Sequence, residues 1–264
     1  MNELKKKVKD FWDDAPCGTG SIDKELFTKE YYEKVEKYRY RFESEIFSFA
    51  QFTRYNKMKV LEVGVGMGTD FHQWIRAGAK AYGIDATKKG IEHTSRRLEL
   101  NNVKPIYLKI GDAENLPFDD NYFDLVYSWG VIHHTPDTEK ALREIVRVTR
   151  PGGECKVMVY NKHSLGTFYV WLKYAFLRGK PWKRFSWCLS NYQESPGTKA
   201  YTVKEIREML GEFALEKIEI KSKQTYVDTL ELSKKKIVRL FGGFLSTIFR
   251  DYFGWFLMFQ FRKK

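Results

Sequence analysis

The chain has 264 residues, of which 43% are hydrophobic, and carries a net charge of +12 at pH 7. Its three cysteines lie far apart, which argues against a disulfide framework or a cysteine-rich zinc site and suits a reducing cytoplasm. No window of about 18 uncharged apolar residues predicts a membrane-spanning helix, and the charged N-terminus lacks the apolar stretch of a signal peptide. The positive charge favours an anionic partner (nucleic acid, an acidic small molecule or a membrane surface), although a solvated, lysine-rich surface explains it equally well.

Residues 1–56 are expected to form a helical N-terminal cap, because residues 24–52 place apolar side chains at three- and four-residue spacings. From residue 59 onward, strand and helix patterns alternate. Strands are expected at 59–65, 80–86, 105–113, 123–130 and 154–160, and helices at 69–78, 88–102 and 137–150. This order predicts an α/β fold with a doubly wound, mostly parallel sheet and right-handed crossovers.

The pattern changes after residue 160. Residues 162–188 contain six Lys or Arg, no Asp or Glu, and eight aromatic side chains. A helix is expected at 201–213, with Thr202 and Glu205 spaced as a capping box, and further strands at 214–222 and 255–263. Residues 57–264 are therefore expected to form one domain with aromatic-basic inserts at about 162–200 and 222–253.

A glycine-rich loop follows the first strand, in the sequence VLEVGVGMGTD. It places Glu62, Gly64, Gly66 and Gly68 where a ligand can approach the backbone, with a spacing unlike that of a dinucleotide pyrophosphate site. Asp85 ends the second strand, where a carboxylate can accept both ribose hydroxyls, and Asp112 ends the third within reach of an adenine amine. Because Glu62 would repel a pyrophosphate, these residues together favour an adenosine that carries positive charge.

These motifs, with GID, GDAENLPF, FDLVYSWGVIHHTPD and LREIVRVTRPGGE, cover about residues 58–160. In that order the chain resembles the class I S-adenosylmethionine-dependent methyltransferases, within the methyltransferase-11 or ubiquinone-menaquinone methylase-like group. The resemblance implies a seven-stranded Rossmann-like sheet with a reversed last strand, and S-adenosyl-L-methionine as cofactor. It also implies cofactor contacts: Glu62, Gly64, Gly66 and Gly68 at the methionine part, Asp85 and Ala86 at the ribose, Asp112 and Ala113 at the adenine, and Ser128 and Trp129 at the sulfonium and methyl.

The adjacent histidines His133 and His134 allow three interpretations. A metal site with Asp137 is disfavoured, because neighbouring histidines on an extended or turning backbone should point apart and no further His/Cys cluster supplies ligands. Either histidine could serve as a general base for a hydroxyl or ammonium nucleophile. The favoured interpretation makes them wall residues, with Pro136 keeping Thr135 extended and Asp137 or Thr138 capping the next helix.

The leading function is therefore methyl transfer to a small-molecule or lipid-like acceptor, with the methylated atom left open. A tRNA or rRNA methyltransferase is the first alternative, weakened because SWGVIHH replaces an Asn/Asp-Pro-Pro-Tyr/Phe motif after the fourth strand. A nicotinamide-dependent oxidoreductase and a non-enzymatic membrane adaptor are the others. Residues 162–188 are expected either to pack as a helical cap or to touch the acceptor or the inner face of the membrane, and Trp12 and Cys17 to cover the site.

Overall fold

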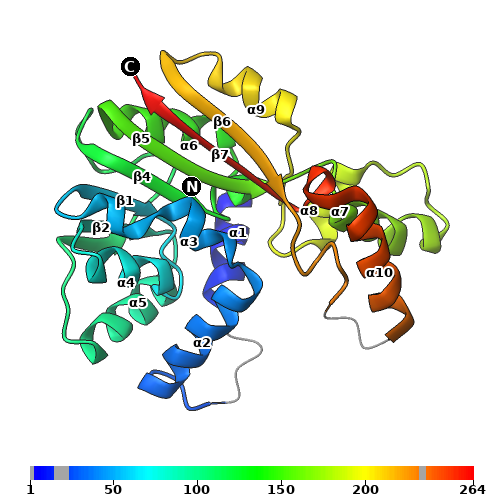
Figure 1. Cartoon of the computed structure of the whole chain (residues 1–264), viewed down its shortest axis with the longest axis horizontal. Helices are drawn as coiled ribbons and strands as arrows, with labels where there is room; N and C mark the ends of the chain where they lie inside the picture. Colours follow the sequence, from blue (N-terminus) through cyan, green and yellow to red (C-terminus); the bar gives the residue numbers. More distant parts are fainter. Residues whose placement is uncertain (1–2, 15–23, 232–235) are drawn as a thin grey trace.

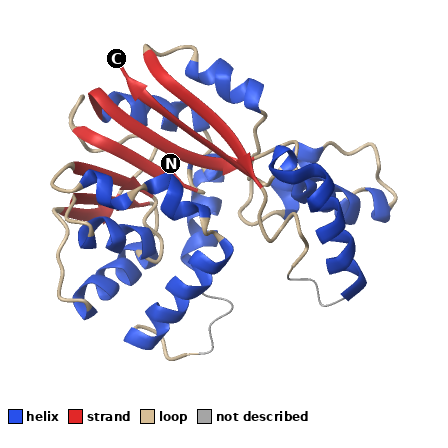
Figure 2. Cartoon of the chain, in the orientation of Figure 1, coloured by secondary structure: helices blue, strands red, loops and turns tan. Residues whose placement is uncertain are grey.

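A seven-stranded sheet forms the centre of the chain in the computed structural model, which describes residues 3–14, 24–231 and 236–264 (Figures 1 and 2). The strands lie in the order β3-β2-β1-β4-β5-β7-β6. They comprise β1 (Lys59–Val63), β2 (Lys80–Asp85), β3 (Tyr107–Ile110), β4 (Phe123–Trp129), β5 (Thr149–Tyr160), β6 (Leu215–Lys223) and β7 (Phe256–Lys263). Strands β1 to β5 pair in parallel, and β7 runs antiparallel to both β5 and β6. The predicted fold, with its reversed last strand, is confirmed.

Alternate residues of the central strands enter two separate cores, as strand geometry requires. On one face Leu125 and Tyr127 of β4 pack with α3 (Glu45–Ala50), α4 (Thr69–Arg76) and α5 (Lys88–Leu100). On the other face Val126 packs with α6 (Thr138–Val148) and α9 (Val203–Leu210). Because both faces are covered, the carboxyl edge of the parallel strands is where a ligand site can form.

The helix ends follow local side-chain chemistry. Asp137 caps α6 by accepting from the Lys140 N–H, and Thr202 and Glu205 form the predicted capping box of α9. Strand β5 begins at Thr149, earlier than expected, because a register shift against β4 accommodates Pro151-Gly152-Gly153 inside the strand.

A helical lobe lies beyond one end of the sheet (right in Figure 1). It contains α7 (Leu165–Tyr174), η3 (Phe176–Arg178), α8 (Phe185–Tyr192), α10 (Lys236–Phe249) and η4 (Arg250–Phe253). Asp228 ties the lobe to the sheet by accepting from the backbone N–H groups of Gly166 and Trp255. Among the described residues, no helix combines the length and apolar character needed to cross a membrane.

The N-terminal residues form α1 (Glu3–Asp14), α2 (Lys29–Phe42), α3 and η1 (Phe52–Tyr55). Tyr31, Tyr32 and Val35 of α2 form a small buried cluster with Met67 of the glycine loop. Helix α1 contacts α5 and carries side chains to the carboxyl edge of the sheet. The cap therefore lies against the region where the sequence places the ligand.

Candidate active site

The glycine loop, residues 64–68, joins β1 to α4 at the carboxyl edge of the sheet. Gly64 has φ 84°, and a Cβ there would lie 2.3 Å from Cγ2 of Val131, so only glycine fits. Gly66 has φ 51°, and a Cβ there would meet no atom within 4 Å. The loop therefore presents backbone to open space on one side, and Gly68 leads directly into α4.

Asp85 is held at the end of β2 by three donors. Its Oδ2 accepts from the Gly66 N–H at 2.8 Å, and its Oδ1 accepts from the Thr87 N–H at 2.9 Å and from the Thr87 hydroxyl at 2.6 Å. Burial raises the pKa of Asp85, and these three donors oppose that shift. The carboxylate is thus fixed beside the glycine loop, with Ala86 exposed next to it.

Lys5 of α1 reaches the acidic residues that follow β3. Its ammonium lies 2.6 Å from Asp112 Oδ2 and 2.7 Å from Glu114 Oε2. Asp112 remains 41% exposed while Ala113 is buried, and the other Glu114 oxygen accepts from the Asp137 N–H. Asp112, which is predicted to contact the adenine, therefore lies beside the ammonium group of Lys5.

Glu62 lies buried at the end of β1. Its Oε2 has no hydrogen-bond partner among the described residues. Burial raises the pKa of Glu62 well above its usual range, as does the charge of Asp70, while Arg39 opposes the shift. The Trp74 indole lowers this pKa in part but does not reach full hydrogen-bond geometry, since its Nε1 is also without a partner in the described chain. An unsatisfied buried carboxyl oxygen is costly unless a ligand donor completes it.

A buried charge network joins the cap to the glycine loop. Arg39 of α2 makes a bidentate ion pair with Asp70 of α4, with N–O distances of 3.1 and 2.7 Å. The hydroxyls of Tyr40 and Tyr127 donate to the same carboxylate. Because Asp70 is almost completely buried, these four contacts fix α2 and β4 against the start of α4.

Ser128 and Trp129 end β4 with their side chains engaged by the protein. The Ser128 hydroxyl donates to the Val63 carbonyl at 3.3 Å and is fully buried. The Trp129 Nε1 donates to Glu43 Oε2 at 2.7 Å, and Glu43 also lies 3.4 Å from Arg39. Burial raises the pKa of Glu43.

The two histidines lie in a short 3-10 helix, η2 (Ile132–His134), and the expectation that their rings point apart was wrong. Their ring centroids are 4.1 Å apart, because the tight turn brings both against Tyr160 of β5. His133 is fully buried, and burial lowers its pKa well below the usual range. Both rings therefore pack beside the end of β5, and their role as wall residues or as a base stays a prediction.

Helix α1 contacts both Asp112, through Lys5, and His134, through Trp12. Asp13 accepts from the Lys89 N–H at the start of α5, and the Trp12 ring meets His134 edge-on at 5.2 Å. Cys17 lies outside the described residues. No three His, Cys, Asp or Glu side chains in the described ranges are arranged to hold a metal ion.

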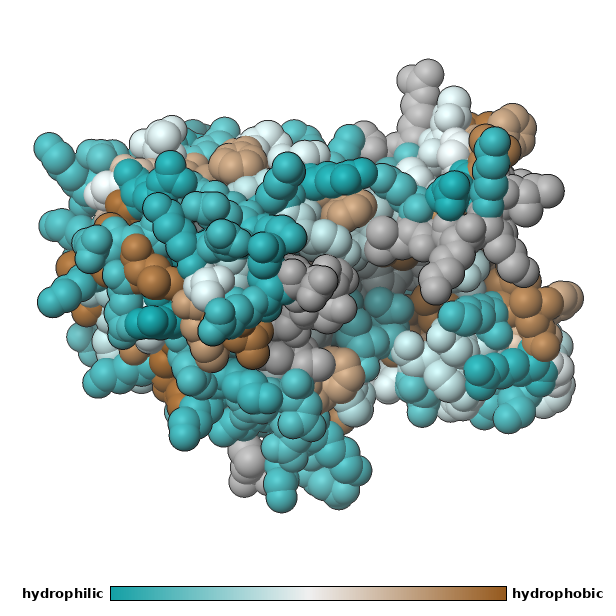
Figure 3. Space-filling model, turned by 90° about the horizontal axis from the view of Figure 1, so that it is seen from below, coloured by the Kyte–Doolittle hydropathy of each residue, from teal (hydrophilic) through white to brown (hydrophobic). Residues whose placement is uncertain are grey.

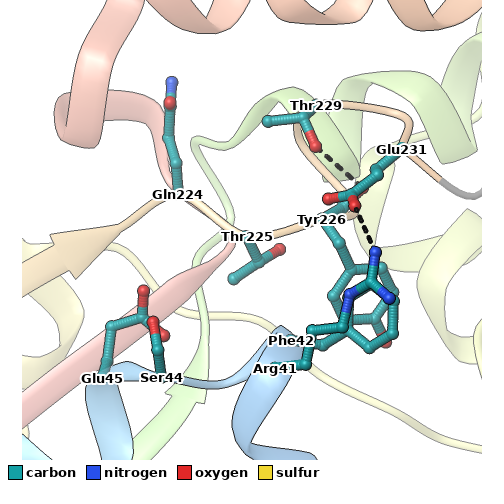
Figure 4. A pocket seen from close by; sticks show the side chains of 9 residues that line it. All are labelled: Arg41, Phe42, Ser44, Glu45, Gln224, Thr225, Tyr226, Thr229 and Glu231. Carbon is teal, nitrogen blue, oxygen red and sulfur yellow. Dashed lines mark hydrogen bonds and ion pairs between the residues drawn. The ribbon is translucent and has the colours of Figure 1, made fainter. Parts of the chain in front are cut away.

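A separate hollow of about 210 Å³ lies between the end of α2 and residues 224–231 (Figure 4). Arg41 and Glu231 face each other across its rim at 3.9 Å, and Thr229 bonds to the Tyr226 carbonyl within it. It holds none of the residues at the carboxyl edge of the parallel strands, so the chemistry described above lies elsewhere.

Several polar residues of this region were missed by sequence reasoning. They are Lys5, Arg39, Glu43, Asp70, Glu114, Tyr160 and Glu194. Asp70 and Glu114 sit inside the quoted motifs and could have been found there, whereas Arg39, Glu43 and Glu194 lie in segments whose charges look like ordinary surface residues. Their positions at the site depend on tertiary packing.

Comparisons with known proteins agree with the motifs. Residues 61–157 match the family model described as a methyltransferase domain, methyltransferase-11. The demethylmenaquinone methyltransferase of Bacillus cereus (strain B4264) is 25% identical over 221 residues, which cover 75% of this chain and 91% of that protein.

Solved structures share the fold. Haemonchus contortus phosphoethanolamine N-methyltransferase 2, solved with phosphomonomethylethanolamine and S-adenosylhomocysteine, superposes with a TM-score of 0.62 at 16% identity. That match covers 97% of this chain but 60% of the nematode protein. The [4+2]-cyclase SpnF superposes with a TM-score of 0.60 at 16% identity, covering 98% and 96%, so the fold alone does not fix the reaction. The family model and the motifs are more specific: residues 61–157 form a methyltransferase-11 domain, and the chain is an S-adenosylmethionine-dependent methyltransferase.

Proposed function

We propose that this methyltransferase transfers a methyl group from S-adenosylmethionine to a small-molecule or lipid-like acceptor by direct in-line displacement. One observation carries the proposal. Asp85 is bound to the backbone of Gly66 over the open side of the glycine loop, beside Glu62, whose buried Oε2 lacks a donor. A ribose hydroxyl and an ammonium group are the partners that these two carboxyl groups would accept.

The residues present fit the cofactor. Its ammonium group would satisfy Glu62 and favour the ionised carboxylate, and the bare backbone at Gly66 leaves room for close approach. We propose these contacts: Glu62, Gly64, Gly66 and Gly68 at the methionine part, Asp85 and Ala86 at the ribose, Asp112 and Ala113 at the adenine, Ser128 and Trp129 near the sulfonium. The sulfonium supplies an activated methyl, so the protein contributes mainly alignment and exclusion of water.

Two similar proteins support a small acceptor. The Bacillus relative is named for a quinone precursor and the nematode enzyme for a phosphorylated amino alcohol, so both names give small molecules rather than nucleic acid. The experiment pairs calorimetry, using S-adenosylmethionine and NAD, with label transfer from methyl-labelled cofactor into a metabolite and lipid extract and into total RNA. Cofactor binding with label in a small molecule or lipid supports the proposal. Binding of NAD alone, or label confined to RNA, would overturn it.

We further propose that residues 1–56 act as a cap, and that within the 57–264 methyltransferase domain residues 162–188 contact an anionic membrane. Hydrophobic side chains of this segment face solvent, with Trp182 72% and Leu177 70% exposed, and Figure 3 shows hydrophobic atoms at the right-hand end of the molecule, the end of the lobe. The neighbouring cations Lys173, Arg178 and Lys183 suit anionic headgroups.

Vesicle sedimentation tests this contact without deleting the segment, whose Val170 and Cys188 belong to the core. Wild-type protein should sediment with phosphatidylcholine vesicles that contain phosphatidylglycerol, and the double variant Leu177→Ser/Trp182→Ser should not. Ile106→Ser, an equally exposed apolar residue on the loop before β3, is the matched control. If wild type and the double variant sediment alike, residues 162–188 do not make the contact.

A further inference from the structure

The loop between α8 and α9 folds back over the carboxyl ends of β4 and β5. The Lys199 N–H donates to the His133 carbonyl at 3.1 Å, and the Tyr201 N–H donates to the Tyr160 carbonyl at 2.8 Å. These bonds place Glu194 beside η2, with φ 52°, a left-handed conformation that is uncommon for a residue with a side chain. A residue from a distant segment is thereby held at the place where acceptor sites form in this fold.

The Glu194 carboxylate is held through one oxygen. The Tyr160 hydroxyl donates to Oε2 at 2.7 Å, and His134 Nε2 lies 3.4 Å from the same oxygen. Among the described residues, no contact is made to Oε1, and the side chain is 33% exposed. One oxygen is therefore fixed by the protein while the other is left for a ligand.

His134 Nδ1 lies between two hydroxyls. The Thr198 hydroxyl donates to the Ser195 carbonyl at 2.6 Å, so its oxygen, 3.1 Å from His134 Nδ1, can only accept from that nitrogen. The Ser195 hydroxyl, 2.9 Å from Nδ1, can donate to it or accept from it. These contacts hold the imidazole with Nε2 3.4 Å from Glu194 Oε2, longer than the bond from the Tyr160 hydroxyl.

His133, next to His134 and Tyr160, provides a second observation at this site. His133 is fully buried, and neither of its ring nitrogens has a partner within the described part of the chain. Its ring lies 4.1 Å from the Tyr160 ring and 4.1 Å from that of His134. A buried imidazole without hydrogen bonds lowers stability, and such residues persist where a ligand or reaction needs them.

Charges of both signs lie near Glu194. Glu43, which binds the Trp129 indole at the end of β4, lies close enough for Glu194 to add to the rise in its pKa that burial causes. Arg39 lies 3.4 Å from Glu43 and offsets its charge, so a preference for a cationic acceptor depends on the Glu194 carboxylate itself. The fields of lysines in solvent are screened over roughly 10 Å.

From this geometry we infer that Glu194 binds and deprotonates the methyl acceptor, that His134 and Tyr160 position it, and that the acceptor is an amine. The inference rests on the proposed function. The ammonium group of the acceptor pairs with Glu194, gives it one proton, and Glu194 releases that proton to solvent. The free nitrogen lone pair then forms the N–C bond, the electrons of the breaking S–C bond remain on sulfur as a neutral thioether, and the product leaves as a methylammonium ion.

Calorimetry on the S-adenosylhomocysteine complex tests this without turnover. Phenethylamine and 2-phenylethanol are the probes, because they differ only in ammonium against hydroxyl. The amine should bind at least about tenfold more tightly to wild type, and Glu194→Gln should remove that preference. Tyr160→Phe should reduce it while leaving alcohol binding unchanged, a difference that a merely structural role would not produce. Glu208→Gln, an exposed carboxylate on α9, is the control.

Two failures can be told apart. If S-adenosylhomocysteine does not bind, the proposed function fails. If it binds but the amine has no advantage over the alcohol, or Glu194→Gln keeps the advantage, the amine inference is wrong and the proposed function stands. Label transfer into the amine fraction of a metabolite extract, abolished in Glu194→Gln, would support the inference. Label found only in neutral or carboxylic acid products would overturn it.

Discussion

The candidate site has two halves that are assembled in different ways. The donor half, Glu62, Gly66, Asp85 and Asp112, comes from the ends of three adjacent strands, and backbone groups orient most of it. The acceptor half is made by Glu43, Trp129, His134, Tyr160 and Glu194. These residues come from the C-cap of α2, β4, η2, β5 and the loop before α9. Local sequence order builds the donor half, whereas buried side-chain contacts between distant segments build the acceptor half.

The two halves also differ in how much their ligands can vary between similar enzymes. The donor half resembles a site prepared for one cofactor, because its shape is fixed by glycine conformations and strand ends. The acceptor half depends on long side chains such as Glu43 and Glu194, whose substitution can change the site without disturbing the sheet. Differences in acceptor between similar enzymes can therefore arise in the second half alone.

Removing Arg39 should have the largest effect. Arg39→Met leaves Asp70 buried without its counter-ion, and we expect unfolding free energy to fall by about 3–5 kcal/mol, measured by chemical denaturation. Arg41→Met, an exposed neighbour 3.9 Å from Glu231, should cost less than about 0.5 kcal/mol. Adding Asp70→Asn to Arg39→Met should recover part of the loss. Equal losses from the two arginine variants would show that the Arg39–Asp70 pair does not hold α2 against α4.

The difference between the halves also explains what sequence could predict. The alternation of apolar strands and capped helices specifies the sheet, and glycine and aspartate positions after strands mark the donor half. Sequence alone does not show that Arg39 pairs with the buried Asp70, because its neighbours on α2 include the exposed Lys37 and Arg41. The sequence does not predict the position of Glu194 either. Its left-handed conformation and its contact with Tyr160 depend on where α8 ends relative to β5.

Asp85 should show the second largest effect, on binding rather than on folding. Asp85→Ala removes the proposed ribose acceptor and the anchor of the Gly66 N–H, so S-adenosylmethionine affinity should fall by about 100-fold in calorimetry. Asp85→Asn keeps one acceptor oxygen and should lose about tenfold. Full affinity in Asp85→Ala would mean that the donor half lies elsewhere, while the fold and the acceptor half would be untouched by that result.

A pH experiment tests the burial of His72 on α4, the helix that follows the glycine loop. Burial lowers the pKa of His72 on α4 to about 4, and Arg97 and Arg76 add to this. Between pH 6.5 and 4 the unfolded chain binds a proton that the native chain does not, so acidification should destabilise the protein. We expect wild type to lose about 1–2 kcal/mol more than His72→Gln between pH 7 and pH 5. The exposed His163→Gln should behave as wild type, and parallel pH curves for wild type and His72→Gln would contradict the prediction.

Lys5 should give the smallest effect, yet it tests whether α1 joins the two halves. In this structure its ammonium occupies the acidic border that the adenine is proposed to approach. Removing this partly exposed ion pair by Lys5→Met should raise S-adenosylmethionine affinity by about threefold to fivefold. The gain should shrink in high salt, because screening already weakens the pair in wild type.

Lys7→Met is the matched control, since Lys7 pairs only with Glu3 on its own helix in the described contacts. It should leave affinity unchanged at every salt concentration. A fall in affinity for Lys5→Met would reverse the interpretation: Lys5 would then help to close α1 over the bound cofactor instead of competing with it. In that case the Trp12–His134 contact at the far end of α1 would form part of a closed state shared by both halves.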